Sequence, residues 1–367
     1  MPQERVLLLI PHLGHGGAER VMTLLAQRLS RRKYDLHLGL VTQGKDTALP
    51  ALPASVTVHC LGADRVRGAL LPLARLIQRL RPGVVLSSMA HLNFAVLMLR
   101  PLFPRDIRVL VRQNGTASAM LADARTPSTA RFLYRTLYPR ADRVLCQTES
   151  MADDLRSLTA IGRARLSVIP NPVDIEAVRA DALPPLFQPE LSGPRLLAVG
   201  RLAREKGYDI LLNAFALVRA SFPTATLTIA GEGAEEGVLK AHAACLGLKG
   251  SVRFLGYVET PEKLFATTSV FVHSSRHEGM PNALLEAAAA GLPLVVTPAS
   301  GGMVDQLRDQ PGAWLAREVS AEALSETLAC ALGSLKPEQR FPHAWIDRFS
   351  LGKAIAAYEA ALDGNPA

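Results

Sequence analysis

Residues 271–302 read FVHSSRHEGMPNALLEAAAAGLPLVVTPASGG, and this stretch decides the fold. Apolar, β-branched residues at both ends predict two buried strands, and the alanine- and leucine-rich segment 282–290 predicts a helix between them. Pro281 fits the first turn of that helix, where a backbone N–H is not needed, and Gly291 fits its left-handed exit. The stretch is therefore one β-α-β unit of a parallel sheet, and such sheets bind ligands at the carboxyl ends of their strands.

Two carboxylates mark this unit as a candidate binding site. Glu278 lies in the loop before the helix, and Glu286 lies within an otherwise apolar helical segment. The N–H groups of Gly279, Met280 and Asn282 would face an anionic or oxygen-rich ligand at the positive end of the helix dipole. The alternative is that Glu278 only complements the dipole and that Glu286 is a solvated helix residue.

A second polar loop precedes this unit in the chain. Residues 195–200, RLLAVG, predict a strand, and RLAREKG follows at 201–207. Arg201 and Lys206, with the loop N–H groups, provide what a diphosphate needs at the carboxyl end of a strand. The alternative is two surface cations in a turn.

The chain begins with the same pattern. A strand at 5–10 leads through the glycine-rich turn PHLGHGG to a helix at 18–29. The turn contains Gly16 and Gly17, and Glu19 and Arg20 open the helix. It is neither a G-x-G-x-x-G fingerprint nor a P-loop, so alone it indicates only a close approach of backbone to ligand. The alternative is that Glu19 and Arg20 lie in a solvated first turn of the helix.

Charge is unevenly distributed along the 367 residues. Residues 1–170 carry 24 Lys and Arg against 11 Asp and Glu, and the remainder carries 17 against 22. A basic first half favours an anionic partner, such as membrane lipid or a phosphate-bearing acceptor. Aromatic residues are only 5% and none alternate with the arginines, which argues against nucleic acid. The alternative is that the high arginine content reflects a genome of high GC content and not a binding partner.

These motifs together resemble one family. Glu278-x7-Glu286, the Gly-Arg-Leu-x-x-Glu-Lys-Gly loop ending at Gly207, and Gly-Gly-Ala-Glu-Arg at 16–20 are similar to the donor site of family four retaining glycosyltransferases. The resemblance covers nearly the whole chain. It implies an α/β protein of the GT-B fold, in which two Rossmann-like domains with parallel sheets face each other across a cleft.

The resemblance also implies a domain layout. Residues 1–170 would form the acceptor-binding domain, 171–194 the linker, and 195–344 the nucleotide-sugar domain. A last helix, predicted from Trp345 to Ala361 within 345–367, would pack back on the first domain.

By the same resemblance, Arg201 and Lys206 bind the donor's pyrophosphate, Glu278 positions the donor sugar and Glu286 binds the ribose. Glu278, Arg201 and Lys206 are the catalytic candidates. The implied donor-binding residues are Gly16, Gly17, Arg201, Lys206, Gly231, Tyr257, Val258, Glu278, Gly279, Met280, Pro281, Asn282 and Glu286. The candidates for acceptor contacts are Glu19, Arg20, His91, Arg112 and Asn114.

One position departs from the family pattern. Many relatives have a histidine in the loop after the strand at 108–112, near the sugar's anomeric carbon, and here the motif position holds Asn114. His91, after the preceding strand, is the alternative. The subset of the family that builds lipid-linked oligosaccharides is similar to this chain in both loops.

The implied activity is retaining, metal-independent hexosyl transfer without a cofactor. A nucleotide-diphosphate sugar, expected to carry UDP, would donate to a glycan or a polyprenyl-diphosphate-linked glycan in polysaccharide biosynthesis. Two alternatives stay open: a nucleotide-sugar epimerase of the same fold, and a non-catalytic partner subunit. The absence of a basic, cleavable leader and the four scattered cysteines favour the cytoplasm, with peripheral attachment to an anionic membrane surface.

Overall fold

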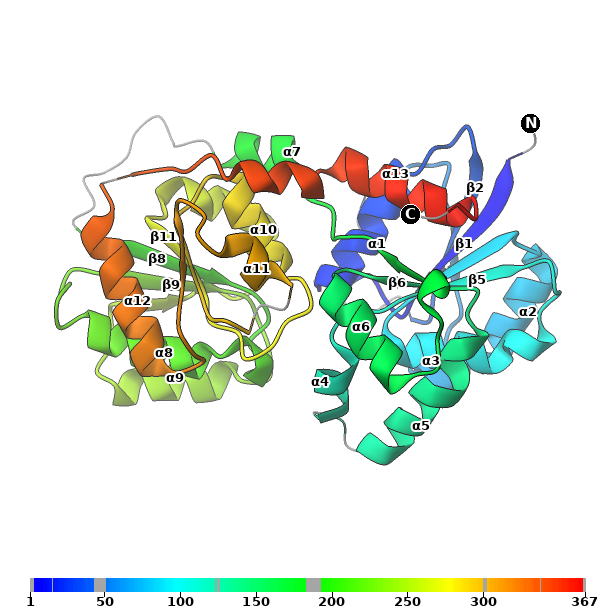
Figure 1. The fold of residues 1–367 in the computed structure, drawn as a ribbon, viewed down its shortest axis with the longest axis horizontal. Helices are drawn as coiled ribbons and strands as arrows, with labels where there is room; N and C mark the ends of the chain where they lie inside the picture. The colour runs from blue at the N-terminus through cyan, green and yellow to red at the C-terminus, as the bar shows by residue number, and fades with distance from the viewer. Residues whose placement is uncertain are drawn as a thin grey trace. The chain divides into compact units, whose positions relative to one another are not determined.

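The computed structural model divides the chain into two compact units (Figure 1). Unit 1 comprises Met1–Pro172 and Gly352–Ala367, and unit 2 comprises Val173–Leu351. Ser300 and Pro184-Pro185, part of the loop and of the linker discussed above, lie outside the described residues. The structure describes residues 3–14, 16–42, 51–122, 124, 126–182, 193–299, 302–336 and 338–365.

Unit 1 is built on a parallel sheet with strand order β3-β2-β1-β4-β5-β6-β7. The middle residues of its central strands are apolar, as expected for parallel strands buried on both faces. Successive residues of β1 alternate between the two faces, because Leu7 and Leu9 pack in one core and Leu8 and Ile10 in the other. The strands are β1 (Glu4–Ile10), β2 (Tyr34–Leu40), β3 (Thr57–Cys60), β4 (Val84–Ser88), β5 (Arg108–Arg112), β6 (Arg143–Cys146) and β7 (Leu166–Val168).

Helices cover both faces of this sheet. The face with Leu8 packs against α1 and α13, the last helix of the chain, and the face with Leu7 packs against α2, α3, α5 and α6. The helices of unit 1 are α1 (Gly17–Arg28), α2 (Leu70–Leu80), α3 (Ala90–Leu99), α4 (Ala117–Ala122), α5 (Pro127–Leu137), α6 (Glu149–Leu158) and α13 (Leu351–Leu362), with short 3-10 helices at Val66–Ala69, Arg100–Leu102, Tyr138–Arg140 and Arg163–Arg165.

Unit 2 repeats the architecture with strand order β10-β9-β8-β11-β12-β13, again all parallel. One core contains α8, α9 and α12, and the other contains α7, α10 and α11 on the opposite face. The strands are β8 (Arg195–Val199), β9 (Thr226–Ala230), β10 (Val252–Phe254), β11 (Val270–His273), β12 (Leu294–Val296) and β13 (Ala313–Leu315). The helices are α7 (Ile175–Asp181), α8 (Tyr208–Val218), α9 (Glu236–Cys245), α10 (Asn282–Ala289), α11 (Met303–Leu307) and α12 (Ala321–Ser334), with short 3-10 helices at Arg204–Lys206, Pro261–Thr267 and Ala344–Phe349.

The predicted last helix, Trp345–Ala361, is wrong in one respect, because it is two elements. A 3-10 helix ends at Phe349, and α13 begins at Leu351. Between them Ser350 is extended and pairs with Val173, whose N–H donates to Phe349 O at 2.9 Å. This backbone pairing interrupts the helix where the chain passes from unit 2 to unit 1.

The first part of the segment 171–194, which was predicted as a linker, contains a helix. Its residues Ile175–Asp181 form α7, which belongs to unit 2 and contacts α10. Asp174 caps this helix, since its side chain accepts a hydrogen bond from the Ala177 N–H. The chain therefore leaves unit 1 at Pro172 and is at once part of unit 2.

Candidate active site

The two polar loops of unit 2 leave adjacent strands. Strand β8 pairs with β11 in the centre of the sheet, while β9 lies outside β8 and β12 lies outside β11. The chain thus proceeds in opposite directions from these two strands, which is the topological switch point of a doubly wound sheet. Loops diverge at such a point, so the carboxyl ends of β8 and β11 are where this fold leaves room for a ligand.

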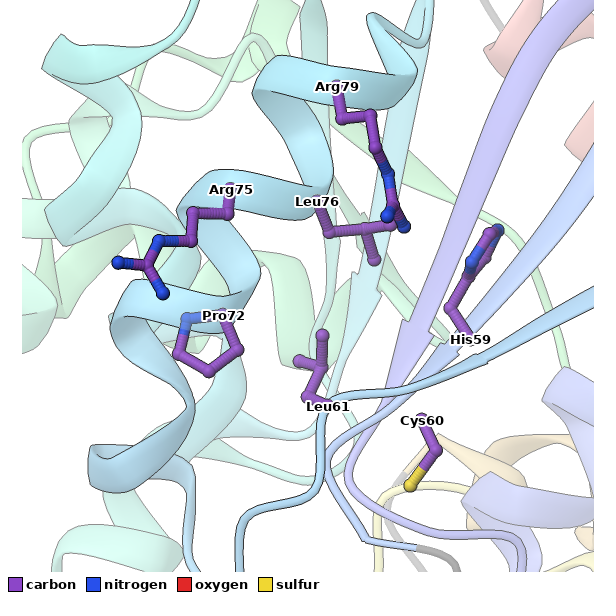
Figure 2. Close-up of a pocket in the computed structure, with 7 residues that line it drawn as sticks. All are labelled: His59, Cys60, Leu61, Pro72, Arg75, Leu76 and Arg79. Atoms are coloured by element: carbon purple, nitrogen blue, oxygen red, sulfur yellow. The ribbon is translucent and has the colours of Figure 1, made fainter.

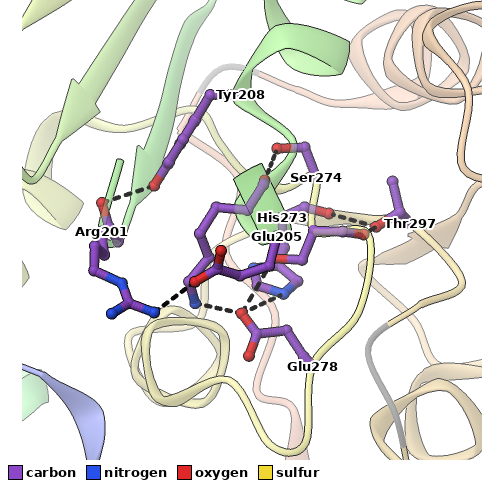
Figure 3. A network of polar contacts seen from close by, with 10 residues as sticks. Arg201, Glu205, Tyr208, His273, Ser274, Glu278 and Thr297 are labelled. Atoms are coloured by element: carbon purple, nitrogen blue, oxygen red, sulfur yellow. Dashed lines mark hydrogen bonds and ion pairs between the residues drawn. The ribbon is translucent and has the colours of Figure 1, made fainter. Parts of the chain in front are cut away.

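The structure brings Lys206 and Glu278 together at this point. Lys206 Nζ donates to Glu278 Oε1, and Ser275 Oγ donates to the same oxygen at 3.1 Å (Figure 3). The side chains of Lys206 and Glu278 are 22% and 15% exposed. A partly open ion pair at a strand end is a polar contact that an incoming ligand could rearrange.

Charge interactions keep Glu278 ionised. Burial acts to raise its pKa, but the positive charge of Lys206 and hydrogen bonds from Lys206 and Ser275 bring the pKa below its ordinary value. The site therefore holds a carboxylate, which can accept hydrogen bonds from hydroxyl groups.

His273, the last residue of β11, lies behind this pair. It is 5% exposed, its Nε2 is 4.0 Å from Glu278 Oε1, and this nitrogen has no hydrogen-bond partner among the described residues. Burial lowers its pKa to about 4, an effect that Glu278 opposes and Lys206 adds to. The imidazole is accordingly neutral at physiological pH.

Backbone geometry holds Lys206 in place. Gly207 has φ of 63°, and a Cβ there would lie 2.2 Å from the Ser274 carbonyl oxygen. Ser274 Oγ donates to Lys206 O at 2.9 Å, and the Arg276 guanidinium forms hydrogen bonds of 2.7 and 2.6 Å to the two carboxylate oxygens of Asp209. These contacts join the loop after β8 and the start of α8 to the loop after β11.

Arg201 lies at the start of the same loop and is largely exposed. Its guanidinium pairs with Glu205, one turn further along the chain. The neighbouring Gly200 carbonyl accepts a hydrogen bond from Tyr208 Oη at 3.0 Å. Arg201 and Lys206 thus lie in one loop, each with a carboxylate partner.

The glycine-rich turn after β9 lies next to the loop after β10. Gly231 pairs with Gly256 through a backbone bridge, and a Cβ on Gly231 would lie 2.0 Å from Gly200 O. The backbone N–H of Tyr257 donates to Glu232 Oε1 at 3.1 Å, and the Tyr257 side chain is exposed. Val258, the next residue, is half-buried.

Helix α10 begins where the sequence predicted. Pro281 lies at its N-cap and not in its first turn, where it was predicted, and no side chain caps the helix. Gly279 and Met280 are buried, Asn282 is half-buried, and Glu286 is only 6% exposed. Glu286 is therefore not the solvated helix residue of the alternative interpretation.

Unit 1 has the same kind of switch point at β1 and β4, which pair in the centre of its sheet. Gly16 is the N-cap of α1 and Gly17 its first residue. Glu19 is buried and folds back over this end, because a Cβ on Gly16 would lie 2.3 Å from Glu19 Oε2. His12 Nδ1 is 3.7 Å from Glu19 Oε1.

The two candidates for the sugar-facing position occupy neighbouring strand ends. His91 follows β4 and is exposed at the surface, and the partial burial of its ring lowers its pKa, with His12 lowering it further and Glu19 opposing this. Asn114 follows β5 and is half-buried, with its amide bound to Ser88 and Arg112. Arg112, by contrast, is buried at 1% exposure, and Arg20 is exposed on α1.

Comparisons with known proteins match both units. The family model described as "Glycosyltransferase Family 4" matches residues 15–177, and "Glycosyl transferases group 1" matches residues 187–343. The lipopolysaccharide core biosynthesis glycosyltransferase LpsE of Rhizobium meliloti is 31% identical over 79% of this chain and 78% of its own length. The chain belongs to glycosyltransferase family 4.

Further relatives agree with this family 4 assignment. The N-acetylgalactosamine-N,N'-diacetylbacillosaminyl-diphospho-undecaprenol 4-alpha-N-acetylgalactosaminyltransferase of Campylobacter jejuni is 27% identical over 82% of both chains. Among solved structures, Anabaena HepE with UDP and glucose has a TM-score of 0.81 at 19% identity, covering 99% of this chain and 100% of its own. The predicted GT-B fold is confirmed.

Several residues of this candidate site were missed by sequence reasoning. Ser275, His273 and Glu205 contact the predicted cations and carboxylate, and Arg276 with Asp209 joins the two loops. Ser275, His273 and Arg276 lie in the stretch quoted at the outset, so their position directly after a strand was the available signal. The sequence did not indicate which residues they would contact.

Away from these strand ends, unit 1 has a pocket of about 350 Å³ between β3 and α2. Figure 2 shows Arg79 extending from α2 toward His59, with Arg75 and then Pro72 on the preceding turns. In the described part of the chain, no group of three or more His, Cys, Asp or Glu side chains could hold a metal ion. No helix within those residues is both long and apolar enough to cross a membrane.

Proposed function

We propose that this family 4 enzyme transfers a hexosyl group, with retention of configuration, from a nucleoside-diphosphate sugar to a lipid-linked glycan. The single observation that carries the proposal is the Lys206–Glu278 pair at the switch point of unit 2, with Arg201 in the same loop. Cations and a carboxylate at one strand edge match the two parts of the donor, a diphosphate and a sugar with hydroxyl groups.

In this mechanism the two cations act on the leaving diphosphate. Negative charge grows on that group as the glycosidic bond breaks, and Arg201 and Lys206 stabilise it without a bound metal ion. Binding of the donor exchanges the Lys206–Glu278 contact for contacts to phosphate and sugar. Glu278, kept ionised by its neighbours, then accepts hydrogen bonds from the sugar hydroxyls.

The donor nucleotide in the proposal is UDP. Glu286, buried in the second turn of α10, is the residue assigned to the ribose, and the backbone of Tyr257 and Val258 is assigned to the base. Support for UDP comes from HepE of Anabaena, whose structures are described as complexes with UDP and with UDP-glucose.

The acceptor in the proposal is a polyprenyl-diphosphate-linked glycan at the inner face of the plasma membrane. The relative from Campylobacter jejuni is named for such an acceptor. The basic first half of the chain also supports the assignment, as does the exposed arginine cluster of α2, which we define as Arg75, Arg79 and Arg81. Exposed arginines beside the β3–α2 pocket suit anionic head groups.

A thermal-shift panel tests the donor site first. UDP, GDP, ADP and their sugars are added to wild type and to Glu286→Ala, with and without EDTA. A ligand that binds only the folded protein raises the Tm by mass action. We expect a shift with UDP or its sugar that is insensitive to EDTA and weaker in Glu286→Ala.

A transfer assay then separates the proposal from its rivals. UDP-hexoses or UDP-N-acetylhexosamines are mixed with polyprenyl-diphosphate glycans, and the product's anomeric configuration is read by NMR. Release of an altered free sugar without acceptor would indicate an epimerase instead. No nucleotide shift and no transfer by well-folded protein would favour a non-catalytic partner subunit.

A further inference from the structure

Arg112 occupies an unusual position at the end of β5. Its side chain is among the largest that are fully buried in the protein, with 1% exposure. Its guanidinium donates to three side-chain oxygens: Tyr358 Oη at 2.9 Å, Asn114 Oδ1 and Asn171 Oδ1. All three acceptors are uncharged, and within the described residues no carboxylate forms an ion pair with Arg112.

A buried cation without a counter-ion needs an explanation other than stability. Removing a guanidinium from water is expensive, and an apolar side chain of similar volume would often stabilise the fold as well or better. What the guanidinium offers instead is direction, because it only donates hydrogen bonds and its donors point along fixed lines in one plane.

That direction determines how the Asn114 amide is oriented. Because Arg112 cannot accept a hydrogen bond, the Asn114 atom that faces it must be the oxygen. The amide nitrogen then faces Ser88, to whose Oγ it donates at 3.0 Å. The nitrogen carries two hydrogens, and the second has no partner within the described residues. Asn114 is half-buried, so an N–H donor is presented at the carboxyl end of β5.

The other two partners of Arg112 lie where the chain passes between the units. Asn171 immediately precedes Pro172, the last residue of unit 1 before the chain enters unit 2. Tyr358 is on α13, in the segment with which the chain returns to unit 1. One guanidinium therefore ties the loop that contains Asn114 to both connecting segments.

We propose that Arg112 is a positioning residue that fixes the Asn114 amide as a hydrogen-bond donor to a substrate oxygen, and that Tyr358 and Asn171 hold Arg112 in the required orientation. The inference rests on the proposed transferase function and on the motif position that the family resemblance gives Asn114, next to the sugar. The group recognised is a hydroxyl, ring or phosphate oxygen, since only an acceptor can use the free N–H.

Asn114→Asp provides the sharpest test. Aspartate has the same shape, and its carboxylate would give the buried guanidinium the counter-ion that it lacks, so the Tm should hold or rise. The N–H donor is gone, so kcat should fall about tenfold or more, the effect of losing one well-placed hydrogen bond. Stability and activity thus move apart, which a purely structural role for Asn114 would not produce.

A double-mutant cycle shows whether Arg112 acts through Asn114. Arg112→Met and Asn114→Ala should each lower kcat by a similar factor, and the double variant should be no worse than the more damaging single one. Arg108→Met, at the other end of the same strand, is the matched control and should keep wild-type kcat. Full activity in Asn114→Asp, or losses that multiply in the double variant, would overturn the proposal.

The side-chain NH2 resonances of Asn114 test the positioning without any turnover. Once assigned by their absence in Asn114→Asp, they should shift in Arg112→Met and Tyr358→Phe and stay in place in Arg108→Met. Unchanged resonances in Arg112→Met would rule the proposal out. Absence of transfer and of a UDP shift in wild type would instead reject the proposed function, so the two failures are distinguishable.

Discussion

Lys206 and Glu278 form an ion pair although 72 positions separate them in the sequence. They meet because β8 and β11 are neighbours at the centre of the sheet of unit 2 and each residue lies in the loop that follows its strand. The pair is the feature on which the proposed donor site depends, and it can be tested directly.

Lys206→Met should reduce both stability and nucleotide binding. The substitution leaves the Glu278 carboxylate largely buried without its cation, and the free energy of unfolding should fall by about 1–3 kcal/mol. The UDP-induced thermal shift should disappear. Urea denaturation and the thermal-shift panel measure the two effects.

Lys240→Met is the matched control, because Lys240 pairs with Glu236 on the exposed surface of α9. Exposed pairs contribute only about 0–1 kcal/mol, so its stability and UDP shift should match wild type. Equal effects of the two substitutions would contradict the assigned role of Lys206.

The stability of the protein should decrease as the pH falls, over a pH range set by the pKa of His273. Its pKa is about 4 in the folded protein against an ordinary value of 6.5, so the unfolded chain binds the proton first as the pH falls. The contribution is fully present above pH 6.5 and is lost progressively toward pH 4, for a total of about 3 kcal/mol. Chemical denaturation at several pH values measures it.

His273→Gln should flatten this pH dependence, and identical slopes for variant and wild type would refute the assignment. His343 is also buried, and burial lowers its pKa, so the pH dependence of stability should be flatter still in His273→Gln/His343→Gln.

The pKa of Glu278 lies below its ordinary value of 4.5, so its contribution to stability is lost only in more acidic solution. Glu278→Gln should therefore alter the curve below that pH.

Gly207→Ala should disrupt the loop that carries Lys206. A left-handed conformation costs an alanine about 1 kcal/mol, and the added Cβ would also lie 2.2 Å from Ser274 O, a backbone atom that cannot easily move. Both Tm and the UDP shift should decrease.

Gly237→Ala controls for this change on α9, where a Cβ meets no atom within 4 Å. Helix propensity predicts that it stabilises the protein by up to about 1 kcal/mol. A Gly207→Ala variant as stable as wild type would show that the loop is not held as described.

The arginine cluster of α2 should mediate binding to anionic membranes. Changing Arg75, Arg79 and Arg81 to Glu should abolish co-sedimentation with vesicles that contain anionic lipid, because each residue is exposed and contributes through its charge. Wild-type binding should weaken as salt is added, through screening.

Arg253, Arg308 and Arg317 provide the charge-matched control, since all three are exposed on unit 2. Their change to Glu alters the net charge equally and should leave vesicle binding intact. Loss of binding in both triple variants would indicate a general charge effect, and retention in both would remove the cluster from the proposal.

Much of the local structure could be predicted from the sequence. The strand at 108–112 has the predicted bounds, because hydrophobic periodicity is a local signal. The strand predicted at 195–200 and the helices predicted at 18–29 and 282–290 differ from β8, α1 and α10 by no more than one residue at an end. Helices α7 and α9 were not predicted. Both are polar or short, so their apolar faces gave a weaker signal.

The sequence by itself determined the alternation of strands and helices and which loops carry the charged residues, since strand–loop–helix periodicity and motif spacing are properties of neighbouring positions. Only the tertiary structure decided which of those charges meet and which are buried. Lys206 pairs with Glu278, while Arg112 is withdrawn from solvent and bound to Tyr358, 246 positions away. Pairing and burial depend on how strands distant in the chain line up in a sheet, and no local pattern encodes that order.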